Sequence, residues 1–212
     1  MKKIISTLAA LSVICGSFCT VMPVAAADTD TVAVAESENT KEFDLDKFHS
    51  SSEADGIVYN VYSDFAVVTR VKDEDIEEFT VPDTYKDVPV VGVTDGPFRD
   101  CKKLKKINLS KNVAVFEWIN VAEEGIAEVT VPEDNKFFTS VDGIIYSKDK
   151  KELVCCPTAC GKTKLVIPEE TESIKFGALI CCRDLKEVEM GSKLETIRPS
   201  AFWGCSGLEH IT

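Results

Sequence analysis

Two consecutive segments decide the fold: LVIPEETESIKFGALICCRDLKE at residues 165–187 and VEMGSKLETIRPSAFWGCSGLEH at residues 188–210. When the two are aligned, apolar residues meet apolar residues at an offset of 23, through to Leu185 and Leu208. So many apolar matches in one register indicate a tandem repeat. Self-similarity at a fixed period of roughly 20–50 residues is typical of solenoids. The sequence therefore predicts a solenoid with units of about 23 residues.

Earlier copies extend the repeat toward the N-terminus. Val129-Thr130-Val131 follows Ile107-Asn108-Leu109 at an offset of 22, and Phe79-Thr80-Val81-Pro82 starts 28 residues before Ile107. Each copy alternates apolar and polar residues, so one side of a short strand can pack into a core. Strands of stacked coils lie about 4.8 Å apart, and their apolar residues then form one continuous core. The expected fold class is a β-rich solenoid with little regular helix.

Two insertions lengthen the spacing between repeats. Val129 and Leu165 are 36 residues apart, and the excess over one repeat contains apolar runs on both sides of Ser147-Lys148-Asp149-Lys150. Apolar runs that flank a short polar turn are typical of a β-hairpin. A hairpin insertion is therefore expected at about residues 137–157, and a second of the same type at about residues 57–71.

The repeats resemble those of a known family. Ala201-Phe202-Trp203-Gly204-Cys205-Ser206-Gly207-Leu208-Glu209-His210-Ile211, preceded by Leu165-Val166-Ile167-Pro168 and Ile174, is similar to the BspA-like leucine-rich repeats of bacterial surface proteins. The hairpin that begins Val141-Asp142-Gly143-Ile144 is similar to one that recurs in that family. The resemblance covers about residues 55–212 and implies a secreted or surface-attached protein that binds host proteins, other cells or extracellular material. It implies no shared catalytic residues.

The N-terminal segment predicts export. A basic start at Lys2 and Lys3 precedes an apolar run, and Ala25-Ala26-Ala27 offers the small residues that a signal peptidase cuts. We expect a signal peptide at residues 1–27, cleaved after about Ala27. No later segment is long and apolar enough to span a bilayer, so no membrane insertion of the mature chain is expected.

The region after the signal peptide is strongly acidic. Residues 28–55 carry nine acidic residues against two lysines, a composition that predicts a disordered leader. The solenoid is expected over residues 56–212, with the C-terminal cap absent, so self-association through that open end is expected as well. The net charge of the full chain is −12, which argues against nucleic acid or an anionic membrane surface as a partner.

Few residues could carry catalysis. The two histidines are His49, in the predicted leader, and His210, on the last predicted strand, so we expect no enzyme and no cofactor. Cys101, Cys182 and Cys205 share one repeat position, where buried free thiols are expected. The cluster Cys155-Cys156-Pro157-Thr158-Ala159-Cys160 leaves three alternatives open, namely free thiols, a disulfide and part of a metal site, although a zinc site would need further ligands.

The polar positions of the repeat strands are the candidate ligand-binding residues. Asn108, Thr130, Val166 and Glu189 alternate with buried positions and are expected to form one outward row, with one residue per coil. The sequence thus predicts a secreted or cell-surface interaction protein, adhesin-like and non-catalytic, whose partner is an extracellular protein or glycan. The alternative is a non-catalytic repeat module of a larger exported enzyme or scaffold protein.

Overall fold

The structure is a computed structural model that describes residues 43, 48–94, 96–117 and 125–212. Over these ranges the chain folds into β-strands joined by turns and loops, without a helix. Accordingly, no helix in the described ranges is long and apolar enough to cross a bilayer. The predicted signal peptide and nearly all of the leader before residue 48 lie outside the described residues.

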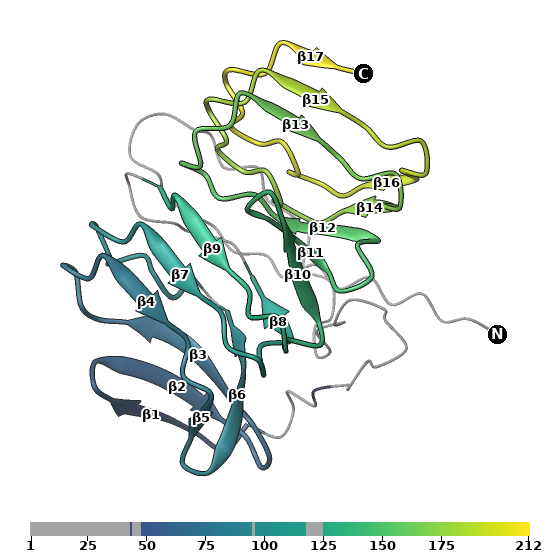
Figure 1. Ribbon diagram of the computed structural model, residues 1–212. Helices are drawn as coiled ribbons and strands as arrows, with labels where there is room; N and C mark the ends of the chain where they lie inside the picture. The colour runs from purple at the N-terminus through teal and green to yellow at the C-terminus, as the bar shows by residue number, and fades with distance from the viewer. Residues whose placement is uncertain (1–42, 44–47, 95, 118–124) are drawn as a thin grey trace.

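Two three-stranded parallel sheets form what we call the repeat face (Figure 1). The first contains β4 (Glu78–Thr80), β7 (Lys106–Asn108) and β9 (Glu128–Thr130). The second contains β13 (Lys164–Val166), β15 (Glu187–Glu189) and β17 (His210–Ile211). The strands are short because each coil must turn away after one buried residue to return to the other side of the solenoid.

The register of these sheets confirms the predicted repeat. Val188 pairs in parallel with Leu165 on one side and with Ile211 on the other. Ile107 likewise pairs with both Phe79 and Val129. The offsets found in the sequence are therefore the spacings at which neighbouring coils stack.

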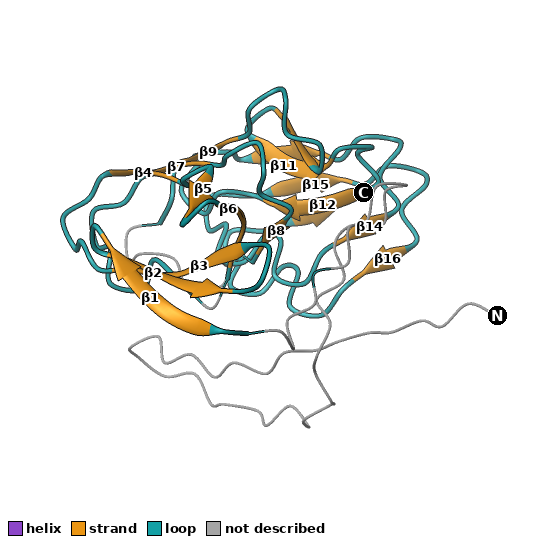
Figure 2. Ribbon diagram, turned by 90° about the horizontal axis from the view of Figure 1, so that it is seen from below, coloured by secondary structure: helices purple, strands orange, loops and turns teal. Residues whose placement is uncertain are grey.

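A second set of strands, the opposite wall, closes each coil (Figure 2). It contains β3 (Ala66–Val71), β6 (Val88–Val93) and β8 (Val115–Phe116), then β12 (Glu152–Cys155), β14 (Ser173–Ile174) and β16 (Thr196–Ile197). Neighbours within each set of three are parallel, and β5 (Thr84–Tyr85) adds an antiparallel strand to β6. The step from β14 to β16 is 23 residues, since Ile174 pairs with Ile197, whereas the step from β12 to β14 is 21 residues, since Leu153 pairs with Ile174.

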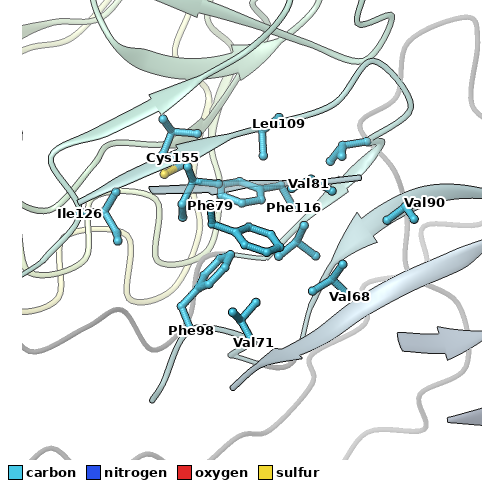
Figure 3. Packing of buried hydrophobic residues seen from close by; sticks show 14 of the residues in the cluster. Val68, Val71, Phe79, Val81, Val90, Phe98, Leu109, Phe116, Ile126 and Cys155 are labelled. Atoms are coloured by element: carbon cyan, nitrogen blue, oxygen red, sulfur yellow. The ribbon is translucent and has the colours of Figure 1, made fainter. Parts of the chain in front are cut away.

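The core lies between the repeat face and the opposite wall. In the first half, Phe79 of the repeat face packs edge-to-face on Phe98, with 5.3 Å between ring centroids, beside Val68 and Val90 of the opposite wall (Figure 3). A second cluster includes the buried residues Leu165, Ile167, Ile174, Leu179, Leu185 and Val188. Each cluster is built from equivalent positions of successive coils, as expected for stacked repeats.

Both predicted hairpins are present, and each is part of a three-stranded antiparallel unit. β1 (Ser50–Ala54) and β2 (Ile57–Val61) lead into β3, while β10 (Phe138–Val141) and β11 (Ile144–Ser147) lead into β12. The first turn of each unit is an Asp-Gly pair with positive φ at both residues: 50° and 75° at Asp55-Gly56, and 51° and 77° at Asp142-Gly143. Such φ values are those of the tight two-residue turn that suits twisted strands.

The predicted disordered leader, residues 28–55, extends too far toward the C-terminus. Residues 50–54 form β1, which pairs residue by residue with β2 from Ser50↔Val61 to Ala54↔Ile57. Phe43 is also buried, with its ring 5.1 Å from that of Phe65 in edge-to-face contact. The acidic composition suggested a solvated segment, but the backbone hydrogen bonds to β2 do not depend on side-chain polarity.

The structure divides into two halves of similar design. Residues 50–130 run from one antiparallel unit through β4, β7 and β9, and residues 138–211 run from the other through β13, β15 and β17. The two halves also have similar sequences at the first turn of each unit: ADGIVY at residues 54–59 resembles VDGIIY at residues 141–146. Because β10, β11 and β12 lie between β9 and β13, these two strands of the repeat face belong to different sheets (Figure 1).

Close stacking of coils also explains why glycine occupies position 191. Gly191 occupies the position equivalent to Pro168 in the preceding coil, and a Cβ atom there would lie 2.6 Å from the Pro168 carbonyl oxygen. Real Cβ atoms essentially never approach an oxygen so closely, so only glycine fits this position without a shift of the backbone.

Candidate functional site

The polar residues of the repeat face point outward because the middle residue of each strand points inward. Phe79, Ile107 and Val129 are buried, whereas the residues on either side of them are exposed or half-buried. A β-strand alternates its side chains between two faces, so one buried residue fixes the outward direction of both neighbours.

Three outward residues of the first half form a connected polar row, which we call the Asn108 row. The Nδ2 atom of Asn108 donates to Thr80 Oγ1 at 3.0 Å, and Thr130 Oγ1 donates to Asn108 Oδ1 at 2.7 Å. The three residues come from β4, β7 and β9, so neighbouring coils hold them in register. Each side chain is therefore fixed by its neighbour as well as by its own strand.

A charged row runs beside the Asn108 row. Lys106 Nζ lies 3.6 Å from a carboxylate oxygen of Glu78 and 3.8 Å from one of Glu128. Glu78 also accepts a hydrogen bond from Asn108 Nδ2 at 2.7 Å. This hydrogen bond and, after it, the charge of Lys106 lower the pKa of the Glu78 carboxyl.

The repeat face of the second half has a different character. Lys164 pairs with Glu187 at 3.2 Å and also contacts the Glu189 carboxylate. Val166 is 58% exposed and lies beside Glu189 in the register. This half therefore presents an apolar side chain next to a compact ion-pair cluster.

The structure brings the four predicted residues together in two pairs. Asn108 lies beside Thr130, and Val166 lies beside Glu189, but the two pairs belong to different sheets. The expectation of one continuous row is wrong, because the unit formed by β10, β11 and β12 lies between β9 and β13 and the repeat face consists of two sheets. Sequence reasoning also missed Thr80 as a member of the row. Its position in the Phe79-Thr80-Val81-Pro82 copy, directly after the buried residue, is the same as that of Asn108 after Ile107 and could have identified it.

The three cysteines of the repeat position are free thiols, as predicted. Cys101 and Cys182 are buried, and burial raises the pKa of the Cys101 thiol to about 11. Cys205 is only half-buried, which differs from the prediction, because no further coil of the described chain covers it. Its thiol donates to the Leu179 carbonyl oxygen at 2.9 Å.

The remaining cysteine cluster contains two thiols in contact. The Sγ atoms of Cys156 and Cys160 lie 3.9 Å apart, and Cys156 is buried while Cys160 is half-buried. They line a small depression together with Thr158, Lys162, Cys182 and Asp184. Among the described residues, no three histidine, cysteine or acidic side chains converge as metal ligands.

The turn that carries these cysteines also joins the two halves. Ala159 N donates to the Ile126 carbonyl oxygen at 2.8 Å, and Thr158 Oγ1 accepts from Ile126 N at 3.1 Å. Gly125 lies so close that a Cβ atom there would be 2.6 Å from Thr158 Oγ1. The turn at residues 157–160 is therefore packed directly against the coil that contains β9.

Comparison with known protein families gives a match over more than half of the chain. A family described as "BspA type Leucine rich repeat region" matches residues 72–141 and 156–212 in six copies. No curated protein matches the chain.

Solved structures provide matches at low sequence identity. A leucine-rich repeat protein from Eubacterium ventriosum matches with a TM-score of 0.53 and 20% identity, over 65% of this chain and 38% of that one. The pneumococcal vaccine antigen PcpA matches with a TM-score of 0.47 and 18% identity, over 78% of this chain and 70% of that one. A leucine-rich repeat protein from T. pallidum matches with a TM-score of 0.48 and 18% identity, over 75% and 69% of the two chains. The first of these supports the solenoid fold.

Proposed function

The chain belongs to the BspA-type leucine-rich repeat family, and from that membership we propose that it is a secreted or cell-surface protein that binds an extracellular protein through its repeat face. The observation that carries the proposal is the Asn108 row, an ordered line of polar groups on stacked coils. Repeat proteins commonly use such extended, regular surfaces for recognition.

The hydrogen bonds within the row favour binding. Ordering a free polar side chain at an interface costs about 0.5–1.5 kcal/mol, and Asn108 and Thr130 already hold one another in place. The Asn108 amide is occupied by bonds to Glu78, Thr80 and Thr130, whereas the oxygen of Thr130, which acts as the donor to Asn108, and that of Thr80, which accepts one bond, each keep a lone pair that can accept a further hydrogen bond. A partner that donates hydrogen bonds at the spacing of the coils would match this row.

The overall charge favours a partner with basic groups. Acidic residues outnumber basic ones by 36 to 24, and Glu78 and Glu128 lie beside the Asn108 row with one lysine between them. A positively charged protein surface is therefore attracted, whereas a polyanion is repelled.

The proposal describes a binding protein without catalytic activity. His49 precedes β1 and His210 begins β17, so the two histidines stand at opposite ends of the solenoid (Figure 1). General acid–base catalysis would need such groups within hydrogen-bond reach of one substrate.

Binding can be tested with a matched pair of double variants. The full chain is immobilised and exposed to a panel of purified extracellular matrix proteins, mucin and plant polysaccharides. Asn108→Ala with Thr130→Ala removes the row, whereas Asn60→Ala with Ser51→Ala removes a similar hydrogen-bonded pair (2.8 Å) from β1 and β2. We expect the first variant to weaken binding of a panel protein by about 10-fold or more, which corresponds to about 1.4 kcal/mol, and the second to leave it unchanged. Equal affinities for both variants would refute the assignment to this row.

Export is tested separately. The protein recovered outside its host cell should have the mass of a chain that begins near residue 28, as cleavage after about Ala27 requires. Recovery of the uncleaved chain inside the cell would contradict the proposed location while leaving the binding experiment intact.

A further inference from the structure

Four thiols form a connected series in the second half of the solenoid. Cys156, Cys182 and Cys205 lie in successive coils, and Cys160 lies at the outer end beside Cys156. The Cys182 sulfur atom lies 3.8 Å from the Cys156 carbonyl oxygen, and hydrogen bonding with the Cys156 thiol raises the pKa of Cys182. Cys160 is partly exposed and lines a depression in the surface, which gives reagents access to this end of the series.

We propose that Cys160 and Cys156 form a thiol–disulfide exchange site, in which Cys160 attacks a small disulfide from solution and Cys156 resolves the product. The geometry supports both roles. Cys160 is partly exposed, and the sulfur atom of the buried Cys156 lies 3.9 Å from its own, so Cys156 can follow as the second nucleophile. The two sulfur atoms must approach to about 2.05 Å to form a bond, a change of about 2 Å at the end of two rotatable side chains.

The reaction balances with the small disulfide as the oxidant. The Cys160 thiolate attacks one sulfur of the disulfide, so a mixed disulfide forms on Cys160 and one small thiolate leaves. Cys156 then loses its proton to solvent and attacks the Cys160 sulfur, which releases the second small thiolate. The protein dithiol is oxidised to the Cys156–Cys160 disulfide, and the small disulfide is reduced to two thiols.

The surroundings of Cys160 favour its thiolate. The hydrogen bond from Cys156 and then the backbone N–H of Lys162, with the charge of the Lys162 side chain, lower the pKa of Cys160 to about 6, against an opposing effect of burial. The hydrogen bond to Cys160 raises the pKa of the Cys156 thiol, so the proton shared by the pair stays on Cys156. Asp184 and Lys162 also line the depression, with opposite charges.

Other cysteines do not share these features. Cys155 and Cys101 are completely buried, and burial raises the pKa of both thiols. Hydrogen bonding with the Cys182 thiol raises the pKa of Cys205, whose proton is directed at the Leu179 carbonyl oxygen. Cys160 is therefore the thiol that combines access, a lowered pKa and a resolving partner.

The site can be tested on the full chain with an aromatic disulfide reagent that releases a coloured thiolate. At pH 6 we expect a fast phase about 10-fold faster than the reaction of cysteines in the denatured chain, because more thiolate outweighs the lower nucleophilicity of an acidic thiol. The fast phase should release two coloured thiolates per chain. Cys160→Ser should abolish it, Cys156→Ser should halve its amplitude and leave the reagent on residue 160, and the control Cys181→Ser should leave it unchanged.

Peptide mapping gives an independent measurement. Trypsin cuts after Lys151 and Lys162, so one peptide carries Cys155, Cys156 and Cys160. In the wild-type chain this peptide should lose two hydrogen atoms after the fast phase and carry no reagent. A peptide with reagent on both Cys156 and Cys160, or a fast phase that survives in Cys160→Ser, would overturn the proposal. Thermal unfolding of each variant shows that a lost phase does not come from a lost fold.

Discussion

Lys175 Nζ donates a hydrogen bond to the backbone carbonyl oxygen of Phe116 at 3.2 Å, across 59 residues of sequence. Phe116 ends β8, the last strand of the opposite wall in the first half, and Lys175 follows β14 in the second half. The bond thus connects the two halves on the side away from the repeat face. The turn at residues 157–160 connects them again through Ile126.

Removal of the Lys175 bond should destabilise the junction of the halves. Lys175→Met keeps the length and apolar part of the side chain and leaves the Phe116 carbonyl without this donor. We expect a loss of about 1–2 kcal/mol in the free energy of unfolding, measured by urea denaturation. Lys103→Met is the control, since Lys103 forms an exposed ion pair with Asp75 at 2.8 Å, and it should change stability by less than about 0.5 kcal/mol. Equal effects of both variants would contradict a role for Lys175 at the junction.

The buried amide of Asn135 should contribute more to the free energy of unfolding than any exposed polar residue. Its Nδ2 atom donates to the carbonyl oxygens of Ser110 and Val113, and its Oδ1 atom accepts from the backbone N–H groups of Phe137 and Phe138, all within 2.9 Å. Asn135→Ala should therefore cost about 2–4 kcal/mol, because it leaves several buried backbone groups without a partner. Thermal or urea unfolding measures the change.

A matched control for Asn135 exists in the same half. Asn112 Nδ2 makes one bond, to the Asp83 carbonyl oxygen at 2.9 Å, in an exposed position. Asn112→Ala should cost about 1 kcal/mol or less, because water replaces the lost donor. If Asn135→Ala proved as mild as Asn112→Ala, the buried network would contribute little to stability.

The pKa of the Glu169 carboxyl group should lie below its ordinary value. The Ser192 hydroxyl and then the Ser192 backbone N–H donate to this carboxylate and lower the pKa of Glu169. A pKa lowered in the folded state adds stability above the unfolded pKa, and this stability is lost as the pH falls through the folded pKa. Ser192→Ala should raise the pKa of Glu169 toward its ordinary value in an NMR titration, and an unchanged titration curve would contradict the assignment.

The last coil should mediate self-association of the 212-residue chain. Ile197, Trp203 and Ile211 are 51%, 47% and 52% exposed, and all three belong to this coil. Apolar side chains next to an unpaired strand edge favour association. Sedimentation velocity should show dimers or larger species, which Trp203→Lys with Ile211→Lys should reduce. The control Val166→Lys replaces an equally exposed apolar residue elsewhere, and a wild-type chain that stays monomeric at high concentration would exclude this surface.

The sequence predicts the coil spacing well because parallel stacking requires equivalent residues to pair. The match of Leu165, Val188 and Ile211 at a constant offset is visible in the letters alone. The pairing of β1 is not visible, since its Ser-Ser-Ser-Glu-Ala sequence has no apolar alternation. Its order comes from backbone bonds to β2, which any sequence can make.

The candidate site was less predictable than the fold. Alternation places Asn108 and Thr130 on the outside, and the insertion predicted at about residues 137–157 lies between them and Val166, but the spacing alone did not indicate that this unit would split the repeat face into two sheets. The contact of Cys156 with Cys160 depends on the path of one turn and on side-chain rotamers. The bond from Lys175 to Phe116 joins residues whose spacing follows no repeat. Such contacts arise from three-dimensional packing and leave no periodic pattern.

The two antiparallel units also bear on the order in which the chain folds. Within each unit, strands are joined by turns as short as Asp55-Gly56, whereas strands of neighbouring coils pair only after loops of 21 to 28 residues have closed. The entropy lost on closing a loop grows with its length, so the local hairpins have a kinetic advantage. We therefore expect the antiparallel unit of each half to form first and to serve as the folding nucleus on which the following coils stack. A chain of this design can grow by whole blocks in evolution, since every added block brings with it the hairpin that starts its folding.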